Sequence, residues 1–177
     1  MAKNFKLFAT LSFIITVLMA AGYMATRQDV LLTLAITFGT IAYHLIMRLA
    51  LSFVFNSTMH NRADLNKSWY RTGKGEMAFY EKLNVRRLNR KMPTYDSSLF
   101  DPRLHSWSEI AQAMCQAELI HETAVALSFL PIIAGTWFGA YPVFIITSIV
   151  AAAFDAVFVV MQRYNRGRIL RGMGRKK

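Results

Sequence analysis

The run Val143–Met161, VFIITSIVAAAFDAVFVVM, is apolar or uncharged throughout except for one carboxylate, Asp155. It has about the 20 residues that an α-helix needs to cross the hydrocarbon core of a bilayer. The run therefore predicts a transmembrane helix, and with it a chain that folds in lipid. An unpaired Asp near the centre of such a helix costs about 2.5 to 3.5 kcal/mol on insertion scales, so we expect a partner for Asp155.

Three further apolar runs precede this one in the 177-residue chain. A content of 54% hydrophobic and 13% aromatic residues is high for a soluble domain. The sequence predicts an all-α, polytopic membrane protein with one membrane domain over residues 1–177. We expect its four transmembrane helices at residues 5–25, 30–55, 120–138 and 143–162, the third interrupted by Pro131. The basic start of the first run also fits a signal peptide.

The segment 56–108, between the second and third spans, is polar and carries ten basic residues against five acidic ones. Within it, alternating apolar and charged positions over Glu76–Lys91 predict a surface-lying helix that ends at Pro93. A further helix is expected to begin with Ser106 or Ser108 as its cap.

Basic residues also gather in the tail 163–177, whereas the connection 136–142 has none. By the positive-inside rule, the tail, the segment 56–108 and both termini face the cytoplasm, in a multi-pass protein of the cell membrane. The net charge of +11 is then a topology signal, so we expect membrane lipids as partners and no nucleic acid. No motif defines an oligomeric state.

Ala117–Glu122, AELIHE, lies at the mouth of the third span and carries three ionisable side chains. On a helix, Glu118, His121 and Glu122 share one face, with the imidazole within reach of both carboxylates. Such a cluster can handle a proton. The alternative is an amphipathic helix start, where the helix dipole favours acidic residues.

The second span contains His44 and Arg48, four residues apart and therefore on one face. Both are costly in hydrocarbon unless they face protein, water or an anionic ligand, and they are natural partners for Asp155. A structural ion pair, or an Arg48 side chain that reaches the nearby interface, would explain them without a ligand.

The tract Gln162–Arg166, with Arg168, places donors where the chain leaves the lipid. Two arginines and an amide can hold a phosphate, a pyrophosphate or a carboxylate in forked hydrogen bonds, although a stop signal would look the same. Gln162 lies seven residues after Asp155, nearly on the same helix face.

Cys115 is the single cysteine, so an intramolecular disulfide is excluded. The four scattered histidines predict no metal site.

These motifs resemble those of the small membrane glycosyl-4,4'-diaponeurosporenoate acyltransferases of staphyloxanthin-type carotenoid synthesis. The resemblance rests on Ala117–His121, on Leu130–Ile133 and on the tract from Gln162 to Arg168, with a weaker part at Val85–Arg87. The chain departs from the family pattern in two tracts and at one further position. It has Leu88-Asn89-Arg90 in place of a Trp-Lys pair, Gly167 where proline is usual, and Asp155 where the carotenoid enzyme has asparagine.

The resemblance implies an acyltransferase that moves a fatty acyl group onto a hydroxyl of a glycolipid or another lipid acceptor. It implies no cofactor, but an acyl donor such as acyl-CoA or acyl carrier protein. In our mechanism His121 is the general base, oriented by Glu118 or Glu122. The expected substrate-binding residues, with cations that hold the phosphates or the acidic headgroup, are His44, Arg48, Arg86, Arg87, Asp155, Gln162, Tyr164, Asn165, Arg166 and Arg168.

Two alternatives come from other classes. A non-catalytic four-helix membrane protein that binds lipids or a partner would pair its charges within the bundle. A different lipid-modifying transferase could also use the same scaffold, because a fold does not fix a reaction.

Overall fold

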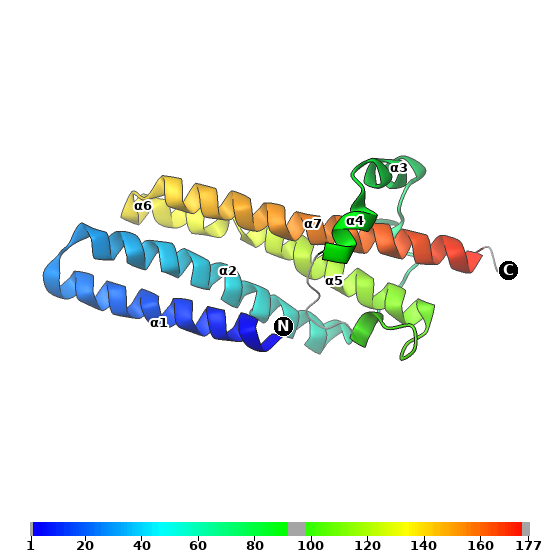
Figure 1. Cartoon of the computed structure of the whole chain (residues 1–177), viewed down its shortest axis with the longest axis horizontal. Coiled ribbons are helices and arrows are strands. Elements are labelled where there is room, and N and C mark those ends of the chain that lie inside the picture. Colours follow the sequence, from blue (N-terminus) through cyan, green and yellow to red (C-terminus); the bar gives the residue numbers. More distant parts are fainter. Residues whose placement is uncertain (1, 92–97, 175–177) are drawn as a thin grey trace. The chain divides into compact units, whose positions relative to one another are not determined.

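The computed structural model describes residues 2–91 and 98–174, which form helices and contain no strand. The long helices are α1 (Ala2–Thr26), α2 (Asp29–Met59), α5 (Trp107–Leu127) and α7 (Tyr141–Gly174) (Figure 1). The shorter helices and 3₁₀ turns are η1 (Ser68–Tyr70), α3 (Lys74–Lys82), α4 (Val85–Lys91), η2 (Ser98–Phe100), η3 (Leu130–Ala134) and α6 (Gly135–Phe138).

Within the described residues, four helical stretches are long and apolar enough to cross a membrane. They are Lys3–Thr26, Asp29–Met59, Trp107–Phe138 and Tyr141–Gly174. The predicted all-α fold with four such helices is confirmed. The third and fourth stretches extend beyond the predicted spans, since α5 begins at Trp107 and α7 continues without a break to Gly174. The exit tract from Gln162 to Arg168 is therefore helical.

The chain divides into two compact units. The first unit comprises Met1–Leu51 and Ala124–Phe154, and the second comprises Ser52–Thr123 and Asp155–Lys177. Since α2, α5 and α7 each contribute residues to both, the division does not follow the ends of the helices. The single membrane domain stays a prediction.

In the first unit, α1 and the beginning of α2 lie side by side in opposite directions (Figure 1). Arg27 reverses the chain between them with a left-handed φ of 56°, and its backbone N–H donates to the Tyr23 carbonyl at 2.8 Å. The missing side chain of Gly39 permits close approach, because a Cβ there would lie 3.2 Å from Thr16 Cγ2. The Tyr43 hydroxyl then ties α2 to α5 by donating to the Leu127 carbonyl at 2.9 Å.

The third apolar stretch is not one continuous helix. The regular helix α5 ends at Leu127, and Pro131 lies at the start of η3, where its missing N–H leaves no helical hydrogen bond unmade. Gly139 then turns the chain with a left-handed φ of 66°. The interruption predicted at Pro131 thus coincides with the change from α-helix to 3₁₀ turn.

In the second unit, two short helices replace the single one predicted over Glu76–Lys91. Asn84 takes a left-handed conformation, with φ of 52°, and separates α3 from α4. A left-handed residue interrupts a right-handed helix, and asparagine tolerates this conformation better than most residues. The prediction of a single helix was therefore wrong. Its predicted end at Pro93 lies outside the described residues.

Two local features fix the elements around the second unit. Ser106 is the cap of α5: its hydroxyl accepts from the Glu109 N–H at 3.3 Å, and the Glu109 carboxylate accepts from the Ser106 N–H at 2.8 Å. A small apolar core joins α3 and α4 to α7, since those helices bury the side chains of Met77, Tyr80, Val85, Met161 and Tyr164 against one another.

Candidate functional site

Glu118 on α5 is fully buried, and both of its carboxylate oxygens are bonded to arginines of α7. Arg163 Nη1 donates to Oε1 at 2.6 Å, and Arg166 Nη1 donates to Oε2. The two arginines are three residues apart on one helix, so both reach the same partner. Pairing with the two arginines offsets the cost of burying a charged carboxylate.

The two arginines also donate to residues of the segment that connects α2 to α5. Arg163 Nε donates to Glu76 Oε1 at 2.6 Å, and its Nη1 donates to the Trp69 carbonyl at 3.0 Å. Arg166 donates twice to the Tyr70 carbonyl, from Nε at 3.2 Å and from Nη2 at 2.9 Å. We call the four charged side chains the ion cluster: Glu76, Glu118, Arg163 and Arg166. Their two positive and two negative charges balance.

The contacts of Arg166 in the ion cluster differ from the phosphate-holding role that the sequence predicted for it. Its side chain is fully buried, with donors directed to Glu118 and the Tyr70 carbonyl. Arg168 differs, because it is exposed and its guanidinium lies 5.7 Å from the ring centroid of Tyr164. Arg86 and Arg87 are exposed on α4. Of the predicted phosphate-holding arginines, Arg166 therefore faces the protein interior, and the other three side chains are exposed.

His121 has a different partner from the two that its sequence neighbourhood suggested. Its Nδ1 lies 2.8 Å from Asp155 Oδ1, and its ring stacks on Phe158 with centroids 4.7 Å apart and an interplanar angle of 12°. Asp155 is fully buried, whereas 23% of the His121 side chain is exposed. The structure thus brings together one predicted catalytic residue and one predicted substrate-binding residue.

The two glutamates of the same motif have other contacts. Glu118 belongs to the ion cluster, and Glu122 Oε2 accepts from the Trp69 indole N–H at 3.0 Å. The expected orientation of His121 by Glu118 or Glu122 is therefore replaced by a contact with Asp155. The reason is helix packing: α7 lies against α5, and it supplies both the arginines that engage Glu118 and the carboxylate that faces His121.

The His121–Asp155 pair defines what the imidazole can do. When an ionised carboxylate accepts from Nδ1–H, the lone pair of the ring is on Nε2. That nitrogen can accept a proton, and the carboxylate stabilises the imidazolium that forms. The ring is partly exposed.

His44 and Arg48 lie in the first unit. His44 is buried and meets the Tyr43 ring edge-to-face, with centroids 5.3 Å apart. Arg48 donates to the His44 carbonyl at 2.7 Å and to the Ala151 carbonyl at 3.2 Å. The pairing of Asp155 with either residue stays a prediction.

The remaining predicted residues lie on α7. Tyr164 belongs to the apolar core, whereas Gln162 and Asn165 are partly buried. In the described part of the chain, no three His, Cys, Asp or Glu side chains are grouped as metal ligands. A reaction without metal or cofactor stays a prediction.

Sequence reasoning missed Glu76, and it named Arg163 only as part of the exit tract and not as a site residue. Arg163 lies within the quoted exit tract, and its three-residue spacing from Arg166 signals a shared face. Glu76 carries no such signal, because it is 87 residues from its partner. Burial alone raises the pKa of Glu76, but the hydrogen bonds from Arg163 and Tyr80 and the charge of Arg163 outweigh it, so this pKa lies below its ordinary 4.5. Burial and the hydrogen bond to Glu76 raise the pKa of Tyr80 to about 12.

The fold and this site define a small helical protein that has four helices long and apolar enough to cross a membrane and whose second unit holds paired charges beside a histidine–carboxylate pair. The model of the glycosyl-4,4'-diaponeurosporenoate acyltransferase family matches residues 66–175, more than half of the chain, and the chain belongs to this family. The matched region contains the whole ion cluster together with His121 and Asp155. The predicted resemblance is confirmed, and membership supports an acyltransferase role in general. No curated protein and no solved structure matches the chain.

Proposed function

We propose that this protein is an integral membrane acyltransferase that moves a fatty acyl group from a thioester donor, such as acyl-CoA or acyl carrier protein, onto a hydroxyl of a glycolipid or other lipid acceptor. The observation that carries the proposal is the His121–Asp155 pair inside the family-matched region. The glycolipid acceptor and the acyl transfer are inferred from the activity after which the family is named.

In the proposed reaction, His121 Nε2 takes the proton of the acceptor hydroxyl as its oxygen attacks the thioester carbonyl carbon. The carbon–sulfur bond then breaks, and the departing thiolate takes that proton from the imidazolium. The products are an ester and a free thiol. Asp155 is a positioning residue, since it holds Nδ1 and keeps the lone pair on Nε2.

The ion cluster supports this geometry by fixing the register of α5 against α7. Glu118 lies nearly one turn before His121 on α5, and Arg163 lies about two turns after Asp155 on α7. When Glu118 is bound to the arginines, the helix faces that carry His121 and Asp155 are also opposed. In this proposal the ion cluster positions the two helices, and the His121 imidazole carries out the proton transfer.

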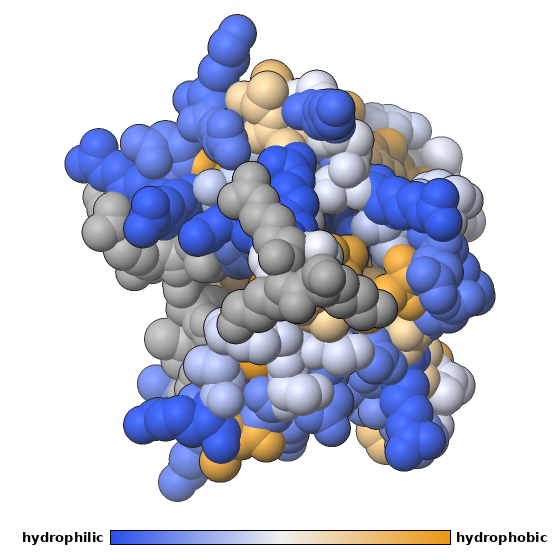
Figure 2. Space-filling view, turned by 90° about the vertical axis from the view of Figure 1, so that its right-hand side faces the viewer, coloured by the Kyte–Doolittle hydropathy of each residue, from blue (hydrophilic) through white to orange (hydrophobic). Residues whose placement is uncertain are grey.

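We further propose that the protein resides in the cell membrane with the segment 56–108 and both termini in the cytoplasm. The basic residues of these parts support this orientation. So does the face at the C-terminal end of α7, where hydrophilic residues predominate (Figure 2). An accessible cytoplasmic segment would let a soluble acyl donor reach the site.

Transfer activity of purified protein in lipid nanodiscs tests the assignment. His121→Ala is expected to lower kcat/KM by about 10²- to 10⁴-fold, the usual contribution of a positioned general base. Asp155→Asn should lower kcat and shift the pH profile while KM stays close to wild type. Glu122→Gln is the matched control from the same helix turn and should retain most activity. Wild-type rates in folded His121→Ala would contradict the role of His121.

A non-catalytic lipid-binding or partner-binding role is the second candidate, because the ion cluster neutralises its own charges in the manner of a structural feature. Lipid mass spectrometry of cells with and without the protein separates the two. A lipid whose mass rises by one acyl chain supports transfer. An unchanged lipid profile supports the binding role, and any other mass difference indicates a different lipid-modifying transferase.

A further inference from the structure

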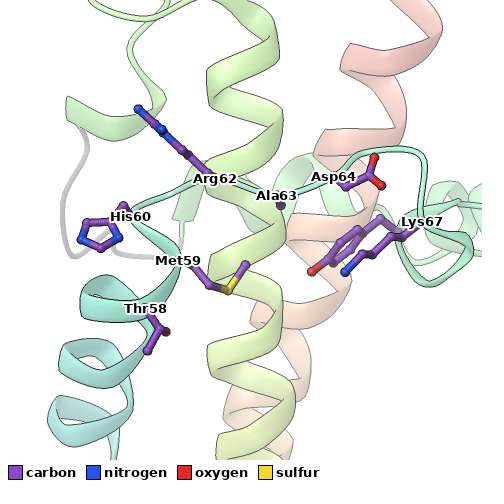
Figure 3. A pocket seen from close by; sticks show the side chains of 8 residues that line it. Thr58, Met59, His60, Arg62, Ala63, Asp64 and Lys67 are labelled. Atoms are coloured by element: carbon purple, nitrogen blue, oxygen red, sulfur yellow. The ribbon is translucent and has the colours of Figure 1, made fainter.

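A second polar feature of the second unit lies where α2 ends. A cavity of about 670 Å³ is lined by Thr58, Met59, His60, Arg62, Ala63, Asp64, Lys67 and Tyr70 (Figure 3). In Figure 3 the side chains of Met59 and Lys67 extend toward each other beneath Ala63, whereas the side chains of His60 and Arg62 lie on the far side of Met59 and point away from Lys67. Its size falls within the range of roughly 300 to 1,000 Å³ that is typical of small-ligand sites.

The charge of the lining favours an anion. Arg62 and Lys67 are cationic and His60 can become so, against the single carboxylate of Asp64. Across the described ranges, no hydrogen bond or ion pair engages the Arg62 or Lys67 side chain. The donors of Arg163 and Arg166, by contrast, are engaged by Glu118, Glu76 and main-chain carbonyls. The cations of the cavity are therefore available to a ligand.

The backbone that carries these cations is held in place. His60 and Asn61 both take left-handed conformations, with φ of 50° and 57°, which persist only where surrounding contacts fix them. The Gln116 side chain supplies such contacts, because its Oε1 accepts from the Asn61 N–H at 2.7 Å and its Nε2 donates to Asn56 Oδ1 at 2.5 Å. A fixed frame lowers the ordering cost of binding.

The position along the chain gives the depth of the cavity and its link to the site. Its lining begins at the last residues of α2, a stretch long and apolar enough to span a membrane, so the proposed membrane orientation places the cavity at the level of lipid headgroups. Tyr70 lines it, and the carbonyl of the same residue accepts from Arg166 of the ion cluster. Tyr70 thus connects the cavity wall to Arg166 on α7.

We propose that this cavity binds the phosphate group of a ligand held at headgroup depth. Two sources present that chemistry: the phosphates of a nucleotide-bearing acyl donor such as coenzyme A, and the phosphomonoester of an anionic lipid. The first source rests on the proposed function, because it places the donor beside the acyl-transfer site. Neither source requires Arg166, which is buried.

The test measures binding, so it does not depend on turnover. Full-length protein in phosphatidylcholine nanodiscs is titrated with coenzyme A, and in a second arm the protein is mixed with vesicles containing phosphatidic acid. The test variant is Arg62→Gln/Lys67→Gln. The control is Lys74→Gln/Lys82→Gln, which removes the same charge from two exposed positions on α3. Unchanged thermal unfolding temperatures show that both are folded.

We expect the Arg62→Gln/Lys67→Gln variant to weaken one of the two phosphate ligands at least tenfold, with the control within twofold of wild type. Loss of coenzyme A binding identifies the donor as the source, and loss confined to phosphatidic acid identifies the lipid. Equal binding by wild type and variant, or equal weakening by the control, overturns the proposal. The His121→Ala variant should bind either ligand as wild type does, so failure of the catalytic assignment would be seen separately.

Discussion

The threonines of the first unit and the charged residues of the second unit satisfy their side chains in different ways. In the first unit, threonine hydroxyls donate to the carbonyl four residues earlier on their own helix, as Thr16 does to Ser12 at 2.7 Å and Thr40 to Ile36 at 2.7 Å. In the second unit, charged groups pair between segments far apart in sequence, as Arg163 does with Glu76 across 87 residues. A local hydrogen bond needs only a helix, whereas a distant ion pair needs a defined tertiary structure. The ion cluster of the second unit therefore depends on the tertiary structure, whereas the threonine hydroxyls of the first unit do not.

The largest expected stability effect comes from breaking the ion cluster. Glu118→Gln leaves two arginines beside a neutral side chain in a buried position, and removing one partner of a buried ion pair costs about 3 to 5 kcal/mol. Thermal or denaturant unfolding in detergent micelles should show this loss. If the comparison of the units is right, the double variant Glu118→Gln/Arg166→Met should lose less than the sum of its single variants. Strictly additive losses would contradict the buried pairing.

A smaller effect is expected where α7 passes close to the segment before α3. A Cβ at Gly167 would lie 2.6 Å from Thr72 Oγ1 and 2.9 Å from Met77 Sδ, so Gly167→Ala should destabilise the second unit by about 1 to 3 kcal/mol through overpacking. Gly172→Ala is the matched control on the same helix, since nothing lies within 4 Å of its added Cβ. The control should gain up to about 1 kcal/mol from helix propensity. Equal unfolding temperatures for both variants would show that this contact is not tight.

The elements of the first unit were predictable because hydropathy and length identify a span without any knowledge of its neighbours. Pro131 also marked its own break, since a missing N–H acts locally. The presence of Asn84 in the sequence does not predict the break between α3 and α4, because asparagine also occurs inside helices. Only its left-handed φ in the structure shows the turn. The local backbone conformation is thus predictable at a residue such as proline, which restricts it, and not at a residue such as asparagine, which accepts both helical and left-handed conformations.

The roles of the predicted site residues stay a prediction, but their contacts can be compared with those that helical spacing favoured. Helical spacing correctly placed Glu118, His121 and Glu122 on neighbouring positions of one helix, and this favoured pairs within that motif. The partner of His121 is instead Asp155, 34 residues away, because the packing of α5 on α7 decides which faces meet. Sequence spacing describes one helix at a time and cannot specify that packing.

The contact between Arg163 and Glu76 should make the second unit sensitive to acid. The folded pKa of Glu76 lies below its ordinary 4.5, so its contribution to stability is complete above about pH 4.5 and is lost as the pH falls through the folded value. Unfolding temperatures measured from pH 7 to pH 3 should decline less steeply in Glu76→Gln than in wild type. Parallel curves for the two proteins would show that this carboxylate is not linked to folding.

The smallest effect is expected in the first unit. Thr40→Val removes a buried hydroxyl whose hydrogen bond stays within α2, and the Ile36 carbonyl that accepted it keeps its place in the helix ladder. Hydrogen bonds of side chains in membrane helices average about 0.6 kcal/mol, so the unfolding temperature should change little. Gln116→Leu is the counterpart in the second unit, where the same loss of one polar side chain releases Asn61 and Asn56 together. A larger loss in Thr40→Val than in Gln116→Leu would reverse the contrast between the units, because it would mean that the helix-local bond carries more tertiary stability than the bond between segments.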